Sequence, residues 1–120
     1  MRRGCLFDAA GRLLVPRLLM ARSPWDRFRG LMGRRSLSDD EGLWLPRCRS
    51  VHTCFMRFAI DIAFVDGSGY IVGLAVPLRP WRCAWNRKAA HTLELPIGGV
   101  ERLGLAAGMA LRLPVYSNSH

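Results

Sequence analysis

The sequence predicts a mainly β fold, an α+β domain in which about six to seven short strands form a small barrel- or sandwich-like sheet. Three observations support this: the apolar stretches are short, turn residues separate them, and one stretch alone has the spacing of an amphipathic helix. The chain has 120 residues, of which 50% are apolar, so it can bury one hydrophobic core. We therefore expect a single domain over residues 1–120.

The N-terminal part predicts strand structure followed by the helix. Residues 11–22, GRLLVPRLLMAR, are rich in Leu and Val, which predicts an early strand, or two short ones, with an edge or bulge at Pro16. Residues 21–35 predict the amphipathic helix, because Ser23 is a suitable N-cap and Gly33 a suitable end. The apolar side chains of this helix fall on one face, which would cover the sheet or plug an open end of it.

The central part predicts two strands around a tight turn. Residues 50–56 fit a strand in which His52, Cys54 and Met56 share one face. Residues 60–65, IDIAFV, fit the next strand. The turn sequence DGSG then predicts an antiparallel hairpin with the YIVGLAV stretch that follows it.

The C-terminal part predicts a loop, a strand, a helical turn and a last strand. The loop holds Trp81 and Trp85, the strand covers residues 89–96, the helical turn 98–104 and the last strand 109–113. A short helical turn therefore accompanies the amphipathic helix in the predicted fold.

The chain is strongly basic. Lys and Arg number 18 against nine Asp and Glu, a net charge of +9, and Lys88 is the one basic residue that is not arginine. The charge is concentrated in residues 17–35, 47–57 and 79–88. Such a charge favours polyanions and acidic partners, and arginine pairs with phosphate or carboxylate in a two-pronged geometry.

The four cysteines, Cys5, Cys48, Cys54 and Cys83, are expected to be reduced. The N-terminal residues lack the apolar segment of an export signal, and no apolar run approaches the length of a membrane span. We therefore expect a cytoplasmic protein without a membrane span, in a compartment where thiols stay reduced.

Cys48, His52 and Cys54 lie within seven positions, a spacing that raises two chemical hypotheses. Zinc needs four ligands, usually as two close pairs, and Cys83 and His91 are the other candidate ligands, so we expect no metal and no cofactor. A nucleophilic Cys54 or Cys48 with His52 as its base would need an electropositive setting, which nearby arginines supply. The simpler alternative is that these thiols pack as small apolar groups.

Asp61 stands in the middle of an apolar run, where a carboxylate must face solvent, pair with a base or accept backbone hydrogen bonds. In one interpretation it forms a clasp with Arg57 across a tight turn. In the other it contributes to a polar pocket with His52, Arg57 or Arg79. Glu94, in TLELP, presents the same alternatives.

The stretch PLRPWRCAWNRK, residues 77–88, interleaves two tryptophans with basic residues. Aromatic platforms beside arginine bind single-stranded nucleic acid, and small β-barrels are a common scaffold for this. Trp81 and Trp85 are equally suited to anchor a long loop or to make a dimer contact. Because adjacent strands lack periodic aromatic residues, nucleic acid is the less favoured partner.

Three blocks of the sequence resemble the DUF192 family, also called UPF0127. They are RGLMGRRSL at 29–37, VHTCFMRFAIDIAFVDGSGYIV at 51–72 and HTLELPIGGVERLGLAAGM at 91–109. The resemblance runs in order across nearly the whole chain. It implies a small, mainly β domain and no established biochemical activity.

Individual steps of the family pattern match residues of this chain, and two steps depart from it. Ala59 stands where a proline often precedes the Ile-Asp step, and Gly108-Met109 replaces a closing Gly-Asp turn. The matching residues are Gly30, Leu31, Met32 and Arg34, then Phe55, Met56 and Arg57, then Asp61, and finally Leu93, Glu94, Leu95 and Pro96.

We therefore expect a binding or accessory module rather than an enzyme. Its site would be a basic-lined polar depression formed by His52, Arg57, Asp61, Arg79 and Glu94, and its ligand a small anion or the acidic segment of a partner protein. The alternatives are a cysteine- and histidine-dependent enzyme and a nucleic-acid-binding module that uses the arginine-rich surface. A monomer or a weak homodimer fits each of these hypotheses.

Overall fold

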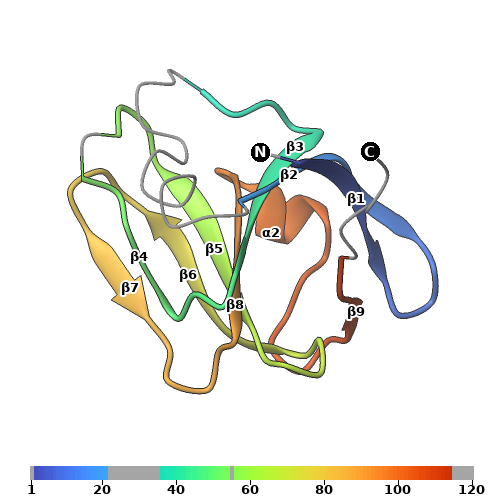
Figure 1. Ribbon diagram of the computed structural model, residues 1–120. Helices are drawn as coiled ribbons and strands as arrows, with labels where there is room; N and C mark the ends of the chain where they lie inside the picture. The colour runs from blue at the N-terminus through green and yellow to red at the C-terminus, as the bar shows by residue number, and fades with distance from the viewer. Residues whose placement is uncertain (1, 22–35, 55, 115–120) are drawn as a thin grey trace.

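The computed structural model describes residues 2–21, 36–54 and 56–114, which form a curled, half-barrel sheet with a smaller sheet beside it (Figure 1). The seven-stranded sheet has the order β6-β5-β8-β3-β2-β1-β9, and the second sheet pairs β4 with β7. The prediction of a mainly β fold is confirmed. The elements are β1 (Arg2–Asp8), β2 (Leu13–Met20), β3 (Glu41–Pro46), β4 (Ser50–His52), β5 (Ile60–Val65), β6 (Ile71–Leu78), β7 (Cys83–Trp85), β8 (His91–Pro96), α2 (Gly99–Arg102) and β9 (Leu111–Arg112).

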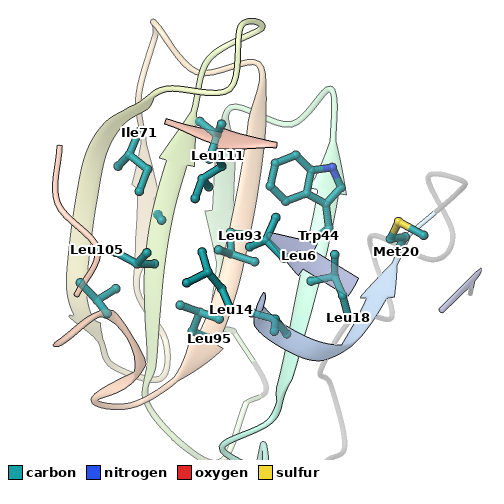
Figure 2. Packing of buried hydrophobic residues seen from close by; sticks show 14 residues of the cluster. Leu6, Leu14, Leu18, Met20, Trp44, Ile71, Leu93, Leu95, Leu105 and Leu111 are labelled. Carbon is teal, nitrogen blue, oxygen red and sulfur yellow. The ribbon is translucent and has the colours of Figure 1, made fainter. Parts of the chain in front are cut away.

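One face of the large sheet packs against α2 and residues 103–113, which follow it. Figure 2 shows Leu6, Leu18, Leu93 and Leu95 gathered on this face beside Trp44, and all five side chains are buried. Trp44 and Leu93 are directly paired across β3 and β8, which places them on the same face. We call this side of the sheet the first face.

The opposite side, the second face, holds a separate apolar cluster. Leu43, Leu45, Ile62 and Phe64 belong to it, and Val51 of β4 joins them from the small sheet. All six residues of β5 are buried, so this strand contributes to both clusters. A strand that is buried on both sides has apolar residues at nearly every position, which explains the IDIAFV sequence.

The hairpin between β5 and β6 forms as predicted. The Asp66 carboxylate accepts hydrogen bonds from the Ser68 and Tyr70 backbone N–H groups, at 2.9 and 3.0 Å. Gly69 has a φ of 98°, in the left-handed region that a side chain disfavours. These local contacts close the turn and set the pairing of the two strands.

Other expectations have mixed outcomes. The strand at the end of the 89–96 stretch and the helical turn within 98–104 are confirmed by β8 and α2. The strand predicted for 50–56 is too long, since β4 ends at His52. Strands β1 and β7 were not expected, and the amphipathic helix predicted for 21–35 lies, apart from its first residue, outside the described residues. Among the described residues, no helix is both long and apolar enough to cross a membrane.

Candidate binding surface

Two arginine-rich segments, far apart in the sequence, lie side by side in the small sheet (Figure 1). We call the described residues of 47–57 and 79–88 the basic surface. Strands β4 and β7 pair antiparallel, and the ladder continues beyond both strands. At one end the Asn86 N–H donates to the Arg49 carbonyl (2.9 Å), and at the other the Thr53 N–H donates to the Arg82 carbonyl (2.8 Å).

Thr53 is the polar centre of this arrangement and is fully buried. Its hydroxyl accepts a hydrogen bond from the Arg82 N–H (3.0 Å) and donates to the Arg79 carbonyl. Its own carbonyl accepts a hydrogen bond from the Trp81 N–H (3.0 Å). Because the backbone and side chain of Thr53 both bond to residues 79–82, the chain turns here and β4 ends.

Asn86 fixes the other end of the small sheet to β6. Its Nδ2 donates to the Val72 carbonyl at 3.3 Å, and its Oδ1 accepts from the Lys88 N–H at 2.9 Å. A Cβ atom at Gly73 would lie 2.4 Å from that Nδ2, closer than any real contact. Gly73 therefore leaves the space that the Asn86 amide occupies.

The two sides of the small sheet differ in burial. Val51 pairs with Ala84, and both pack on the cluster of the second face. The alternate residues point outward and are exposed. The outward pairs are Ser50 with Trp85 and His52 with Cys83.

Two tryptophans of the basic surface are largely accessible to solvent. Trp85 is 72% exposed and Trp81 is 57% exposed, whereas Trp44 in the core is 2% exposed. Trp81 also has a φ of 63°, a backbone conformation that residues other than glycine rarely adopt. These two side chains therefore contribute less apolar burial to the fold than Trp44 does.

The basic surface is rich in cations and lacks carboxylates. Its two segments contain no Asp or Glu. Three ion pairs outside this surface join Arg12 to Asp8 and Arg17 to Asp40 and Glu41. A site of this kind attracts anions. Its basic residues are Arg47, Arg49, Arg57, Arg79, Arg82, Arg87 and Lys88.

Three of the predicted site residues, His52, Arg57 and Arg79, are exposed and lie at this end of the molecule. His52 belongs to β4, and the Thr53 hydrogen bond reaches Arg79 directly. Leu78 of β6 pairs with Ile60, the first residue of β5. Arg79 comes directly after Leu78 and Arg57 three residues before Ile60, so both lie at the same end of the sheet. The structure thus brings these three residues into one region.

Asp61 lies apart from them and is fully buried. It pairs with Leu95 across β5 and β8, on the first face. Its Oδ2 accepts a hydrogen bond from the Val100 N–H at 3.1 Å, so the carboxylate holds α2 against the sheet. Its Oδ1 has no hydrogen-bond partner among the described residues. The expected clasp between Asp61 and the exposed Arg57 is wrong.

Glu94 faces the opposite side of the sheet from Asp61. It pairs with Leu43 and with Ile62, which places its carboxyl among the apolar side chains of the second face. Glu94 is 5% exposed, and burial raises its pKa to about 8. The sheet therefore separates Glu94 from Asp61, and the two carboxyl groups do not line one depression.

At the end of β3, Arg47 of the basic surface contacts the half-buried His91. The Arg47 N–H donates to His91 Nδ1 at 3.2 Å, and the His91 ring lies 5.3 Å from the Trp44 ring between centroids. Burial lowers the pKa of His91, and the Arg47 charge lowers it further. Nδ1 therefore acts as an acceptor on a neutral imidazole.

The cysteines are free thiols in different settings. Cys48 Sγ donates to the Ser50 carbonyl at 2.9 Å, and Cys83 is exposed opposite His52. Cys54 is half-buried beyond the end of β4. In the part of the chain that the structure describes, no three His, Cys, Asp or Glu side chains gather to hold a metal ion.

A separate pocket of about 290 Å³ lies over β1, β2 and β3. Its Arg17 donates two hydrogen bonds to the Asp40 carboxylate, at 2.8 and 2.9 Å, and these lower the pKa of Asp40. Because Arg17 already has an acidic partner, this pocket is less suited to an anion than the basic surface. Its lining residues are Arg3, Gly4, Pro16, Arg17, Leu19 and Glu41.

Sequence reasoning did not single out Thr53, Asn86 or Gly73, which hold the basic surface in place. A glycine inside a strand often marks a close approach of another group, and Gly73 in YIVGLAV carried that signal. Thr53 and Asn86 act through bonds to residues 14 to 29 positions away, and no local pattern marks them.

Comparison with known proteins identifies the family. The model of DUF192, described as "Uncharacterized ACR, COG1430", matches residues 6–113. The chain belongs to the DUF192 family. A UPF0127 protein of Pyrococcus furiosus is 42% identical over 60 residues, 49% of this chain and 51% of the relative. A UPF0127 protein of Thermococcus sibiricus is 31% identical over 103 residues, 82% of this chain and 66% of the relative. The chain therefore spans about half to two thirds of the length of these DUF192 relatives.

Two crystal structures share the fold. One, from Sinorhizobium meliloti, is described as a "putative transcription regulator"; it is 29% identical, with a TM-score of 0.77 over 92% of this chain and 91% of that protein. The other, a protein of unknown function from Novosphingobium aromaticivorans, is 23% identical, with a TM-score of 0.77 over 92% of this chain and 84% of that protein. The second similarity concerns the fold alone.

Proposed function

We propose that this DUF192 protein is a non-enzymatic binding module whose basic surface takes a small anion or the acidic segment of a partner. The observation that carries the proposal is the pairing of two segments that together hold seven basic residues and no carboxylate. His52, Arg57 and Arg79 would contact the ligand. Asp61 and Glu94, buried on opposite faces of the sheet, would not contact it.

The fixed backbone of the basic surface supports this proposal. Thr53 and Asn86 hold the two segments through hydrogen bonds, so the backbone that carries their arginines does not have to be ordered when a ligand binds. Preorganised cations lose less conformational entropy on binding than those of a flexible loop. The description of the Sinorhizobium neighbour as a regulator of transcription is compatible with an anionic partner.

Retention on immobilised heparin, a sulfated polyanion, tests the proposal. The double variant Arg79→Glu and Arg82→Glu should elute at a lower salt concentration than the wild type, because it reverses charge within the basic surface. The matched control is Arg3→Glu with Arg112→Glu, which makes the same change in net charge on exposed residues of β1 and β9. Equal elution of the two variants would mean that net charge alone decides binding, against the proposed site.

A further inference from the structure

We propose that the partner of the basic surface is a single-stranded nucleic acid, with its phosphates on the arginines and its bases stacked on Trp85 and Trp81. This inference rests on the proposed anion-binding role of the basic surface and assigns it a nucleic acid in place of a small anion or an acidic protein segment. The deciding feature is the presence of two accessible indole rings among the cations. Charge alone would serve any anion, whereas an aromatic ring adds a surface for a flat, uncharged group.

Trp85 is placed for stacking by the strand pairing. It lies on the outward side of β7, opposite Ser50, a small residue that is itself exposed. No bulky side chain therefore stands across the strand pair from the indole. At 72% exposed, Trp85 contributes little burial to the core, so the fold alone does not account for a tryptophan at this position.

Trp81 and the basic residues extend this platform along the chain. Trp85 lies four positions after Trp81, a distance of at most roughly 14 Å for extended chain. Arg82 lies between them in sequence, and Arg87 and Lys88 follow. A single strand of nucleic acid presents bases along a charged backbone. The cationic side chains suit its phosphates, and the indole rings suit its bases.

The same features disfavour other partners. A duplex keeps its bases stacked inside, where Trp85 cannot reach their faces. A second copy of the chain would bring two cationic surfaces together, and an acidic peptide would leave the indoles without a role. An anionic membrane needs a broader apolar face. None of the other exposed large apolar side chains among the described residues belongs to the basic surface; they are Phe7, Leu13, Tyr70, Leu74, Val76 and Ile97.

Fluorescence anisotropy with a labelled 12-nucleotide oligo-dT tests the inference against a probe of the same length that has abasic sites and the same number of phosphates. The oligo-dT should bind at least about 10-fold more tightly, because base stacking adds to the phosphate contacts. Trp85→Ala should weaken oligo-dT binding roughly 10-fold and leave the abasic probe unaffected. Trp85→Phe should retain most of the affinity, since it keeps a stacking surface.

The outcomes separate the partner class from the proposed function. If both probes bind equally and Trp85→Ala changes neither, the base-stacking inference is overturned while the anion-binding function stands. If neither probe binds although the wild type is retained on heparin, the inference also fails, but the function does not. If neither probe binds and heparin does not retain the protein, both fail. Binding to vesicles of phosphatidylcholine and phosphatidylserine without binding to oligo-dT would assign the surface to a membrane instead.

Discussion

The two sheets of the molecule differ in what their side chains do. In the seven-stranded sheet, β5 is buried over its whole length and packs on both faces. In the two-stranded sheet, only one side is packed, and the other exposes Trp85, His52 and Cys83. The large sheet therefore supplies most of the buried core, and the small sheet carries the surface that we propose binds the ligand. Substitutions in the two should therefore affect different measurements.

The largest loss of stability is expected from the core of the large sheet. Ile62→Ala removes a fully buried side chain that pairs with Glu94 across β5 and β8. The free energy of unfolding should fall by about 2–5 kcal/mol, measured by urea denaturation. A fall below about 1 kcal/mol would show that the second face is loosely packed.

Glu94 gives the large sheet a pH dependence. Below about pH 4.5 this carboxyl is protonated in both the folded and unfolded states. Between pH 4.5 and about 8 the unfolded state loses the proton first, so the contribution of Glu94 to stability falls as the pH rises. Above that window the penalty is constant.

Glu94→Gln tests this contribution, because glutamine has nearly the same shape and stays neutral. The variant should match the wild type in stability near pH 4 and exceed it above pH 8 by up to a few kcal/mol. Thermal unfolding across this pH range measures the difference. A constant difference at all pH values would mean that the carboxyl titrates normally.

Thr53 is buried like the core of the large sheet, yet its hydrogen bonds hold the exposed basic surface in place. Thr53→Val keeps the shape but leaves the Arg82 N–H without its hydroxyl acceptor, at a cost of about 1–3 kcal/mol. Thr53→Ser retains the hydroxyl and should cost less. Hydrogen exchange of the amides in residues 79–85 should accelerate in the valine variant. Acceleration confined to the large sheet would contradict the assigned role.

The smallest effect on stability is expected for Trp85→Ala. Because this side chain is largely exposed, the free energy of unfolding should change by less than about 0.5 kcal/mol. Chemical denaturation measures it. A loss above about 2 kcal/mol would instead make Trp85 part of the fold.

Sequence reasoning predicted the β5–β6 hairpin well, because its apolar strands and its Asp66 turn are both local signals. It failed where contacts join distant residues. Strand β7 has only three residues, and its pairing depends on Thr53 and Asn86. The prediction that Asp61 and Glu94 line one site is wrong. Asp61 pairs with Leu95, and Glu94, the residue before Leu95, points to the opposite face because successive side chains of a strand alternate between faces.

The most direct test of the basic surface is the mapping of a bound anion by NMR. A short heparin oligosaccharide would be titrated into the isotope-labelled protein while the backbone amide shifts are followed. We predict that the largest changes occur in residues 47–57 and 79–88, with the amides of β1 and β2 nearly unchanged. Changes centred on Arg3 and Arg17, at the pocket over β1 to β3, would contradict the assignment of the small sheet as the binding surface.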